Sequence, residues 1–526
     1  MAIITLITFA PSATVLTIIL LVIPTVVLAH LIWRLISSHG LPNTLPWVGM
    51  GNHVTPIARI RANLASFFNL KDLLDEGYNQ FSKNEKAYVL PYFINGHQVI
   101  LPRSQLQWLL QQPDSVLSQE HVNRQFLQAE HTFFHANLVK NPVHMEVVNH
   151  ELAKLLGTFT GEMVDETRAC LEDLWGSDAG SWREVKLYES MLSLIARLST
   201  RVFIGQPLCH DQDFLGACSS FNRNVALSAA ALSVFPSFLR PLFAPFVTYY
   251  DYLQYQKCCR YIMPIIKERI NKIHCADKLS TFDQEPCNDY IQWAIDHALN
   301  RPVVSLEELD PKVISCRFIV LCFAAIQSSV ITLTNCIFDI AATSNCVSTC
   351  NLMRQEVVNE TMKAGWSKSS LARMRHIDSS LRESLRLNGF IERGIMKMVV
   401  APKGVTLPNG SRIPCGTKVG ISGYSVHHDD SIYKSASTYD AFRFVGSRSE
   451  SPLALVTTSD KFMGFSHGSH ACPGRFFAAN QLKIALAHIL LHYEIEPISK
   501  RPGNQWFFGH IAPPLRDTIR VRRRKM

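Results

Sequence analysis

The sequence lacks the linkers and repeats that would divide a chain of this length. No Gly/Ser-rich or strongly charged segment interrupts its middle, and neither an internal repeat nor a low-complexity tract is present. Its 526 residues are 47% hydrophobic and only 18% charged, which is ample for a large core. Although the length alone would allow two or more domains, the absence of linkers favours one large, mainly helical body.

Basic residues are not concentrated into a stripe. The net charge of +9 is small for the size of the chain, and no basic run is interleaved with aromatic residues, so the sequence predicts no nucleic-acid partner. Part of the excess lies in the C-terminal residues IRVRRRKM. We expect residues 520–525 to form a solvated tail, with contact to anionic lipid headgroups as the alternative.

Paired cysteines are also missing. None of the 14 cysteines stands in a C-x-x-C pair, and their spacing shows no regular framework. Scattered cysteines are typical of a reducing compartment, whereas a secreted disulfide-bonded protein would show a denser pattern.

Charge is absent from the first part of the chain. Residues 3–36 contain no charged side chain before Arg34, and this run exceeds the roughly 20 residues that a membrane-spanning helix needs. No basic residue precedes it, as one would in a cleaved signal peptide. We predict a transmembrane anchor over residues 1–36, a stiff proline-rich lead-in over 37–50 and one globular domain over 51–526.

One cysteine stands apart from the others. Cys472 lies in FMGFSHGSHACPGRFF, residues 462–477, shortly after His467 and His470. A zinc site would have three nearby ligands where structural sites use four, and a thiol nucleophile would need a base and an orienting partner. The third chemistry is an axial thiolate ligand for a haem iron.

The residues around Cys472 favour the haem ligand. Pro473 fits the first turn of a helix in which apolar residues recur at helical spacing. Cys472 would then lie at a helix N-terminus, where free N–H groups and the helix dipole stabilise a thiolate. Gly468 and Gly474 would let the backbone pass close to a flat macrocycle, and His470 could donate a hydrogen bond to a propionate.

The motif Phe465-x-x-Gly468-x-His470-x-Cys472-x-Gly474 resembles the haem-binding signature of the cytochrome P450 family. Arginine is more common in the family where His470 stands. The resemblance implies a mainly α fold with a small β region, here behind one N-terminal transmembrane helix. It also implies haem b with Cys472 as the axial ligand, and makes residues 51–526 the catalytic domain.

Two further motifs stand in the order that the family shows. Glu383-Ser-Leu-Arg386 resembles its K-helix pair, although an E-x-x-R pair by itself is common on helix surfaces. Arg443, 29 residues before Cys472, resembles the arginine that completes a buried cluster with this pair. The resemblance implies that the cluster fixes the cysteine loop against the core. Arg393 resembles an arginine that binds a haem propionate.

A long helix is predicted over residues 310–343, with Asp310 as its N-cap and Pro311 in its first turn. Its middle, FAAIQSSV, resembles the family's oxygen-binding run, where an acid followed by threonine manages protons. Gln327 and Ser328 stand at those two positions. We expect both to be catalytic: Gln327 can order water but cannot release a proton, and Ser328 keeps a hydroxyl.

The substrate side is less marked in the sequence. Residues 225–250 carry three prolines among large apolar side chains. We expect a loop that dips into the bilayer and admits lipid-dissolved substrates, with a buried core segment as the alternative. Phe126, Phe133 and Phe134 lie where the family's loop over the haem often falls and are expected to be pocket walls.

The resemblance implies a fungal, membrane-anchored monooxygenase of secondary metabolism. It would oxidise an apolar terpenoid or meroterpenoid, or alternatively a polyketide or indole alkaloid, with O₂ and with electrons from NADPH through NADPH–cytochrome P450 reductase. Its membrane would be the endoplasmic reticulum, with the catalytic domain in the cytosol because Arg34, Arg59 and Arg61 follow the anchor. Gln327 leaves open an isomerase or dehydratase on the same fold, and a haem-carrying binding or sensor protein is the third alternative.

Overall fold

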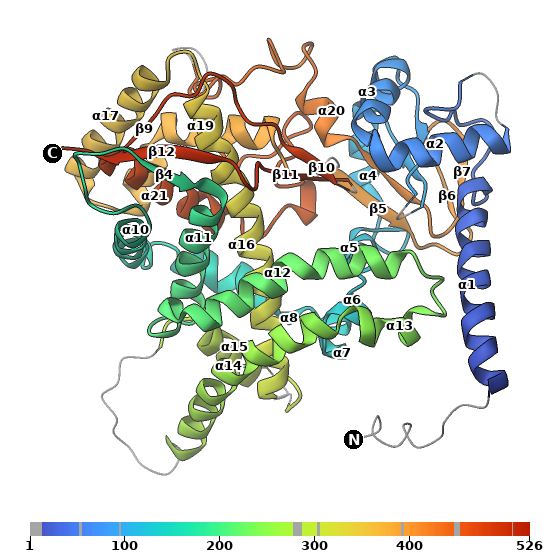
Figure 1. Ribbon diagram of the computed structural model, residues 1–526, viewed down its shortest axis with the longest axis horizontal. Coiled ribbons are helices and arrows are strands. Elements are labelled where there is room, and N and C mark those ends of the chain that lie inside the picture. The colour runs from blue at the N-terminus through green and yellow to red at the C-terminus, as the bar shows by residue number, and fades with distance from the viewer. Residues whose placement is uncertain are drawn as a thin grey trace.

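Figure 1 shows the computed structural model of the protein, which describes residues 13–51, 55–93, 96–276, 287–301, 306–390, 394–446, 453–507 and 509–525. Helices dominate, as predicted. The first part of the chain forms α1 (Ala13–Ile36), α2 (Pro56–Phe68), α3 (Leu70–Gln80), α4 (Leu106–Gln111), α5 (Gln119–Leu127), α6 (Ala129–Thr132), α7 (Ala136–Lys140), α8 (Val143–Val147) and α9 (Ala153–Leu155). The middle forms α10 (Thr160–Trp175), α11 (Leu187–Phe203), α12 (Gln212–Ser233), α13 (Arg240–Val247), α14 (Tyr249–Ala276) and α15 (Tyr290–Leu299). The last part forms α16 (Pro311–Ala341), α17 (Cys346–Ala364), α18 (Lys368–Arg373), α19 (Arg375–Leu387), α20 (Gly423–His427) and α21 (Arg475–His492).

The longest helix, α16, runs through the middle of the molecule (Figure 1). Its predicted start is confirmed, because the Asp310 side chain accepts a hydrogen bond from the Lys312 N–H at 2.9 Å and Pro311 occupies the first turn. By length and composition, α16 is the one described helix that could cross a membrane, yet 67% of its apolar window is buried inside the protein. It is therefore the central core helix, packed against α11, α12, α14 and α19.

The strands are short and lie mostly on one side of α16. The largest sheet has the order β1-β2-β8-β5-β3. Its strands are β1 (Tyr88–Leu90), β2 (Gln98–Ile100), β3 (Leu117–Ser118), β5 (Ile395–Val399) and β8 (Lys418–Ile421). Only β2 and β8 pair in parallel within it. Two hairpins are formed by β6 (Val405–Thr406) with β7 (Arg412–Ile413) and by β10 (Gln505–Phe507) with β11 (His510–Ala512).

The expectation of a solvated C-terminal tail is wrong. Thr518–Arg523 forms β12, the central strand of a sheet with β4 (Arg183–Lys186) and β9 (Tyr493–Ile495). Arg520 pairs with Glu496 at 2.9 Å, and Arg522 pairs with Glu494 at 2.6 Å. The basic run is therefore ordered by backbone pairing, and one acidic residue in β9 and one directly after it neutralise two of its arginines.

Residues 225–250 are mostly helical, which corrects the expectation of a loop. They comprise the end of α12, all of α13 and the start of α14. Pro241 falls in the first turn of α13, where a missing N–H costs no helical hydrogen bond. Several large apolar side chains of this segment are exposed: Phe238, Leu242, Phe246, Tyr249 and Tyr250.

Candidate functional site

A cavity of about 880 Å³ lies between the loop that precedes α21 and the face of α16. The loop contributes Phe465, Gly468, His470, Cys472 and Gly474 to its lining. Helix α16 contributes a face of mainly small side chains, Ala324, Ala325, Ser328, Ser329 and Thr332. The structure thus brings the predicted cysteine motif and the predicted oxygen-binding run to one cavity, although the two motifs lie well over 100 residues apart in the sequence.

The loop around Cys472 is closed by backbone hydrogen bonds. The Cys472 N–H donates to the Phe465 carbonyl at 2.9 Å, and the Arg475 guanidinium donates to the Cys472 carbonyl at 2.8 Å. Gly468 has φ +80°, and a Cβ added there would lie 2.8 Å from Leu110. The positive φ favours glycine at this position, and any larger residue would also displace the Leu110 side chain.

Helix α21 begins later than predicted. Gly474 is its N-cap and Arg475 its first residue, so Pro473 lies before the helix and not in its first turn. The cause is visible in the bonding, since the first helical carbonyl is that of Gly474, which accepts from the Ala478 N–H at 2.9 Å. Burial raises the pKa of the Cys472 thiol, while the N–H groups of Gly474 and Arg475 act in the opposite direction.

On α16, Ser328 and Gln327 point in different directions. Ser328 lines the cavity, and its hydroxyl donates to the Ala324 carbonyl at 3.2 Å. Gln327 is not part of the cavity lining, and its amide donates to the Tyr188 hydroxyl at 3.0 Å. Adjacent residues on a helix lie about 100° apart, and the cavity faces the side of α16 that carries Ala324, Ala325, Ser328 and Ser329, which leaves Gln327 directed toward Tyr188. The expectation that Gln327 orders water beside the reacting oxygen does not fit this geometry.

Glu383, Arg386 and Arg443 form one buried cluster. Arg386 binds Glu383 through two nitrogens, at 2.7 and 2.8 Å, and Arg443 Nε donates to Glu383 Oε1 at 2.9 Å. The Glu383 and Arg386 side chains are fully buried, and that of Arg443 is 13% exposed. A carboxylate held by two guanidiniums in this way is compensated electrostatically.

This cluster reaches the cysteine loop through His427. Arg386 donates to the His427 carbonyl, and His427 Nε2 accepts a hydrogen bond from the Met463 N–H at 2.9 Å. Burial, and then the charge of Arg386, lowers the pKa of His427 to about 3. The imidazole is therefore neutral at working pH and able to accept. A continuous path of bonds links Glu383 to the start of the loop that ends at Cys472.

Comparison with known proteins identifies the family of the chain. The cytochrome P450 family model matches residues 68–515. The chain belongs to the cytochrome P450 family. Its relatives include the cytochrome P450 monooxygenase gloP of Glarea lozoyensis, 31% identical over 529 residues that cover 95% of each chain. The monooxygenase polB of Polytolypa hystricis is 30% identical over 95% of this chain and 97% of its own, and ecdH of Aspergillus rugulosus is 31% identical over 88% of each.

This P450 is accordingly a haem-thiolate monooxygenase that takes electrons from a reductase and acts on a small molecule. The cavity fits the cofactor. Its volume suits a macrocycle together with a substrate, and Cys472 is among the residues that line it. Gly474 lines the cavity, and a Cβ added there would meet no protein atom within 4 Å. The small side chains of α16 that line the cavity leave room beside them.

Some of the other predicted site residues line the cavity and others do not. Phe126 and Phe133 line the cavity, but Phe134 packs against Phe221 and the tyrosines of α14. His470 lines the cavity and binds Asp114 through Nε2 at 3.1 Å. Arg393 lies outside the described residues.

The sequence motifs do not single out three residues that support or line the site. Arg382 stacks between Phe444 and Phe462 and donates to the Ala454 and Thr457 carbonyls at 2.5 and 2.7 Å. His427 bridges the cluster to the loop, as described above. His144 lines the cavity with a buried Nδ1 that has no hydrogen-bond partner. The SLRESLR run carries an arginine before the pair, which could have indicated Arg382. His427 lies in YSVHHDDSIY, residues 424–433, which resembles the family's approach to the arginine cluster and predicts a structural role, whereas the sequence contains no signal for His144.

Proposed function

We propose that this P450 is a membrane-anchored enzyme of secondary metabolism that hydroxylates or otherwise oxidises an apolar intermediate, with Cys472 as the axial ligand of its haem. The observation that carries the proposal is the single cavity that holds Cys472, the Ser328 hydroxyl and apolar walls. When bound, haem supplies the activation of O₂. The chain supplies the thiolate, orients the substrate and excludes water. Phe465, Gly468, His470 and Gly474 frame the cofactor in this proposal, and Arg393 remains a predicted propionate ligand.

A terpenoid or meroterpenoid is the substrate class we favour, with a polyketide or an indole alkaloid as the alternative. Apolar residues of several elements line the cavity, among them Phe126, Phe133, Leu138, Leu152 and Leu321. Such walls favour a large apolar skeleton, and polar residues that also line the cavity, among them Asn123, His144 and Asn149, are available to orient it. The fungal origin of the relatives supports a role in secondary metabolism.

Product analysis tests the proposal. Microsomes that contain the protein and NADPH–cytochrome P450 reductase are fed terpenoid, polyketide and indole precursors, with and without NADPH. We expect a product one oxygen heavier that requires both NADPH and O₂ and comes from the terpenoid set. A product that forms without either would favour an isomerase or dehydratase. Oxidation of polyketides alone would overturn the substrate class and leave the reaction type intact.

Three elements support membrane association. The described residues of α1 include exposed Leu21, Leu28 and Trp33. Helix α2 contacts α1 and exposes Ile57, Leu64 and Phe68, and α13 exposes Leu242 and Phe246. Residues 1–36 would be the anchor, 37–50 the lead-in and 51–526 the catalytic domain. The endoplasmic reticulum, with the catalytic domain in the cytosol, is the location that we propose from the basic residues after the anchor.

Deletion of residues 2–33 should release most of the protein into the soluble fraction while haem content persists. Arg34 is kept because it donates to the Ser233 carbonyl at 2.8 Å and so holds the body to the end of α1. The measurement is the distribution between membrane pellet and supernatant, with haem quantified in each. Phe246→Ser in the full-length chain is the matched control and should stay in the pellet. Complete retention of the truncated protein would show that α2 and α13 suffice as the anchor.

Ser328→Ala should uncouple the reaction. In this proposal the Ser328 hydroxyl passes protons into the cavity. Without it, NADPH should still be consumed, but its electrons should form hydrogen peroxide in place of product. Because a positioned proton donor typically contributes 10²–10⁴-fold, we expect product per NADPH to fall by roughly tenfold or more. Gln327→Glu is the control and should change coupling little, since that side chain faces Tyr188. Unchanged coupling in Ser328→Ala would remove this serine from the proton path.

A further inference from the structure

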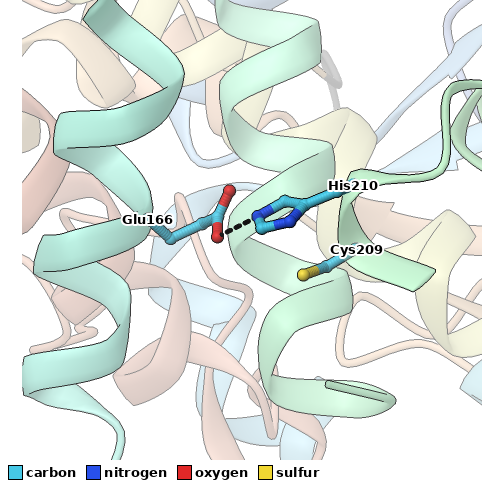
Figure 2. A group of neighbouring side chains, drawn as sticks. All are labelled: Glu166, Cys209 and His210. Carbon is cyan, nitrogen blue, oxygen red and sulfur yellow. Dashed lines mark hydrogen bonds and ion pairs between the residues drawn. The ribbon is translucent and has the colours of Figure 1, made fainter. Parts of the chain in front are cut away.

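A group of three metal-binding side chains lies away from the haem cavity. Glu166 extends from α10, while Cys209 and His210 come from the short turn between α11 and α12 (Figure 2). One ligand atom from each residue lies within 4.8 Å of the others. Across the described ranges, this is the one group of three or more His, Cys, Asp or Glu side chains that come together in this way.

The Glu166 carboxylate is fixed in an orientation that could bind a metal ion through one oxygen. Its Oε1 accepts from Arg197 Nε at 2.5 Å, which leaves Oε2 facing His210 Nε2 at 2.8 Å. Arg197 is itself fixed by Asp173 at 2.7 Å. An outer partner that fixes the unused oxygen of a ligand is a regular feature of metal sites.

The charges around the group leave room for a divalent cation. A Cys209 thiolate with the Glu166 and Asp173 carboxylates would carry three negative charges, and Arg197 balances one of them. The neighbouring Arg201 is paired with Glu162 at 3.2 Å and adds no net charge. A cation of charge +2 would therefore make the site neutral.

Donor types and access indicate which cation fits. One sulfur, one imidazole nitrogen and one carboxylate oxygen form the mixed set that zinc accepts, with bonds of about 2.0–2.3 Å. Cys209 and Glu166 are buried, whereas the His210 side chain is 43% exposed. The cation can therefore enter past His210, and a solvent molecule can complete a four-coordinate site.

We propose that Glu166, Cys209 and His210 bind a zinc ion that ties α10 to the turn at the start of α12. The ion displaces the proton of the Cys209 thiol and inserts between His210 Nε2 and Glu166 Oε2, which are hydrogen-bonded in its absence.

Zinc binding by the haem-loaded protein tests the proposal. The protein is stripped with a chelator, dialysed against buffered zinc and assayed for zinc per haem. X-ray absorption at the zinc edge then measures the ligands, independently of the haem iron. We expect one zinc per haem with one sulfur at about 2.3 Å and the remaining ligands at about 2.0 Å. Thermal melting should shift upward with zinc.

Cys209→Ser and His210→Ala should each weaken zinc binding strongly, because each removes a ligand. Loss of a residue that only supports a ligand already lowers metal affinity by roughly 10–100-fold, so we expect at least this much. Cys415→Ser, at an exposed cysteine outside the group, is the matched control and should bind as the wild type does. If Cys209→Ser fails to fold, His210→Ala decides, because His210 is half-exposed. Absence of zinc from the wild type, or a sulfur ligand that persists in Cys209→Ser, would overturn the proposal.

Discussion

Cys472→Ala is expected to abolish both the reduced carbon monoxide band of a thiolate-ligated haem and all turnover. Among the described cysteines, Cys472 is the one whose residue lines the cavity, and the others lie elsewhere in the core or on the surface. No neighbouring thiol can replace it as a ligand. Because the axial thiolate is what gives the family's iron its reactivity, the loss should be complete and not partial.

Reduced carbon monoxide difference spectra and product assays measure this result, with haem content as the check on folding. Cys415→Ala, at an exposed cysteine, is the matched control and should retain the band and the activity. A Cys472→Ala protein that kept both would show that another residue ligates the iron. A variant that kept the band alone would separate ligation from turnover.

Glu383→Ala should have the second large effect, on folding. Its carboxylate is fully buried between Arg386 and Arg443 and also accepts from the Asp440 N–H at 3.2 Å. Removing it leaves two guanidiniums facing each other without a counter-charge. Breaking a buried ion pair by removing one partner typically costs about 3–5 kcal/mol. This is a large fraction of the usual stability of a domain, so little haem-loaded protein should accumulate.

The two arginines of the cluster provide a graded comparison. Arg386→Ala removes two bonds to Glu383 and the bond to the His427 carbonyl, so it should resemble Glu383→Ala. Arg443 is 13% exposed and makes one bond to Glu383, so Arg443→Ala should cost less. Urea unfolding and haem yield measure the order. Stable, haem-replete Glu383→Ala protein would show that the cluster does not hold the cysteine loop.

Local features of the site could be read from the sequence. The spacing around Cys472, the E-x-x-R pair and the ends of α16 depend on neighbours within a few residues. Backbone geometry over a few residues determines all three features: the Asp310 cap, the conformation of Gly468 and the i,i+3 pairing of Glu383 with Arg386. Short sequence motifs can therefore predict them. Helix α16, the Glu383–Arg386 pair and the cysteine motif also follow one another along the chain in the family's order. The resemblance to the family is confirmed.

Orientation and long-range pairing were decided only by the tertiary structure. Whether Ser328 or Gln327 faces the cavity depends on the rotation of α16 against α11, which Tyr188 reveals by accepting from Gln327. The C-terminal arginines became a strand because β4 and β9 supply partners. His427 joins the Glu383 cluster to the cysteine loop, and Glu166 lies beside Cys209 and His210. In both cases the residues come from segments that are far apart in the sequence. Such contacts join residues that are far apart in the sequence. They form only when whole helices and strands pack against one another, so no short sequence motif predicts them.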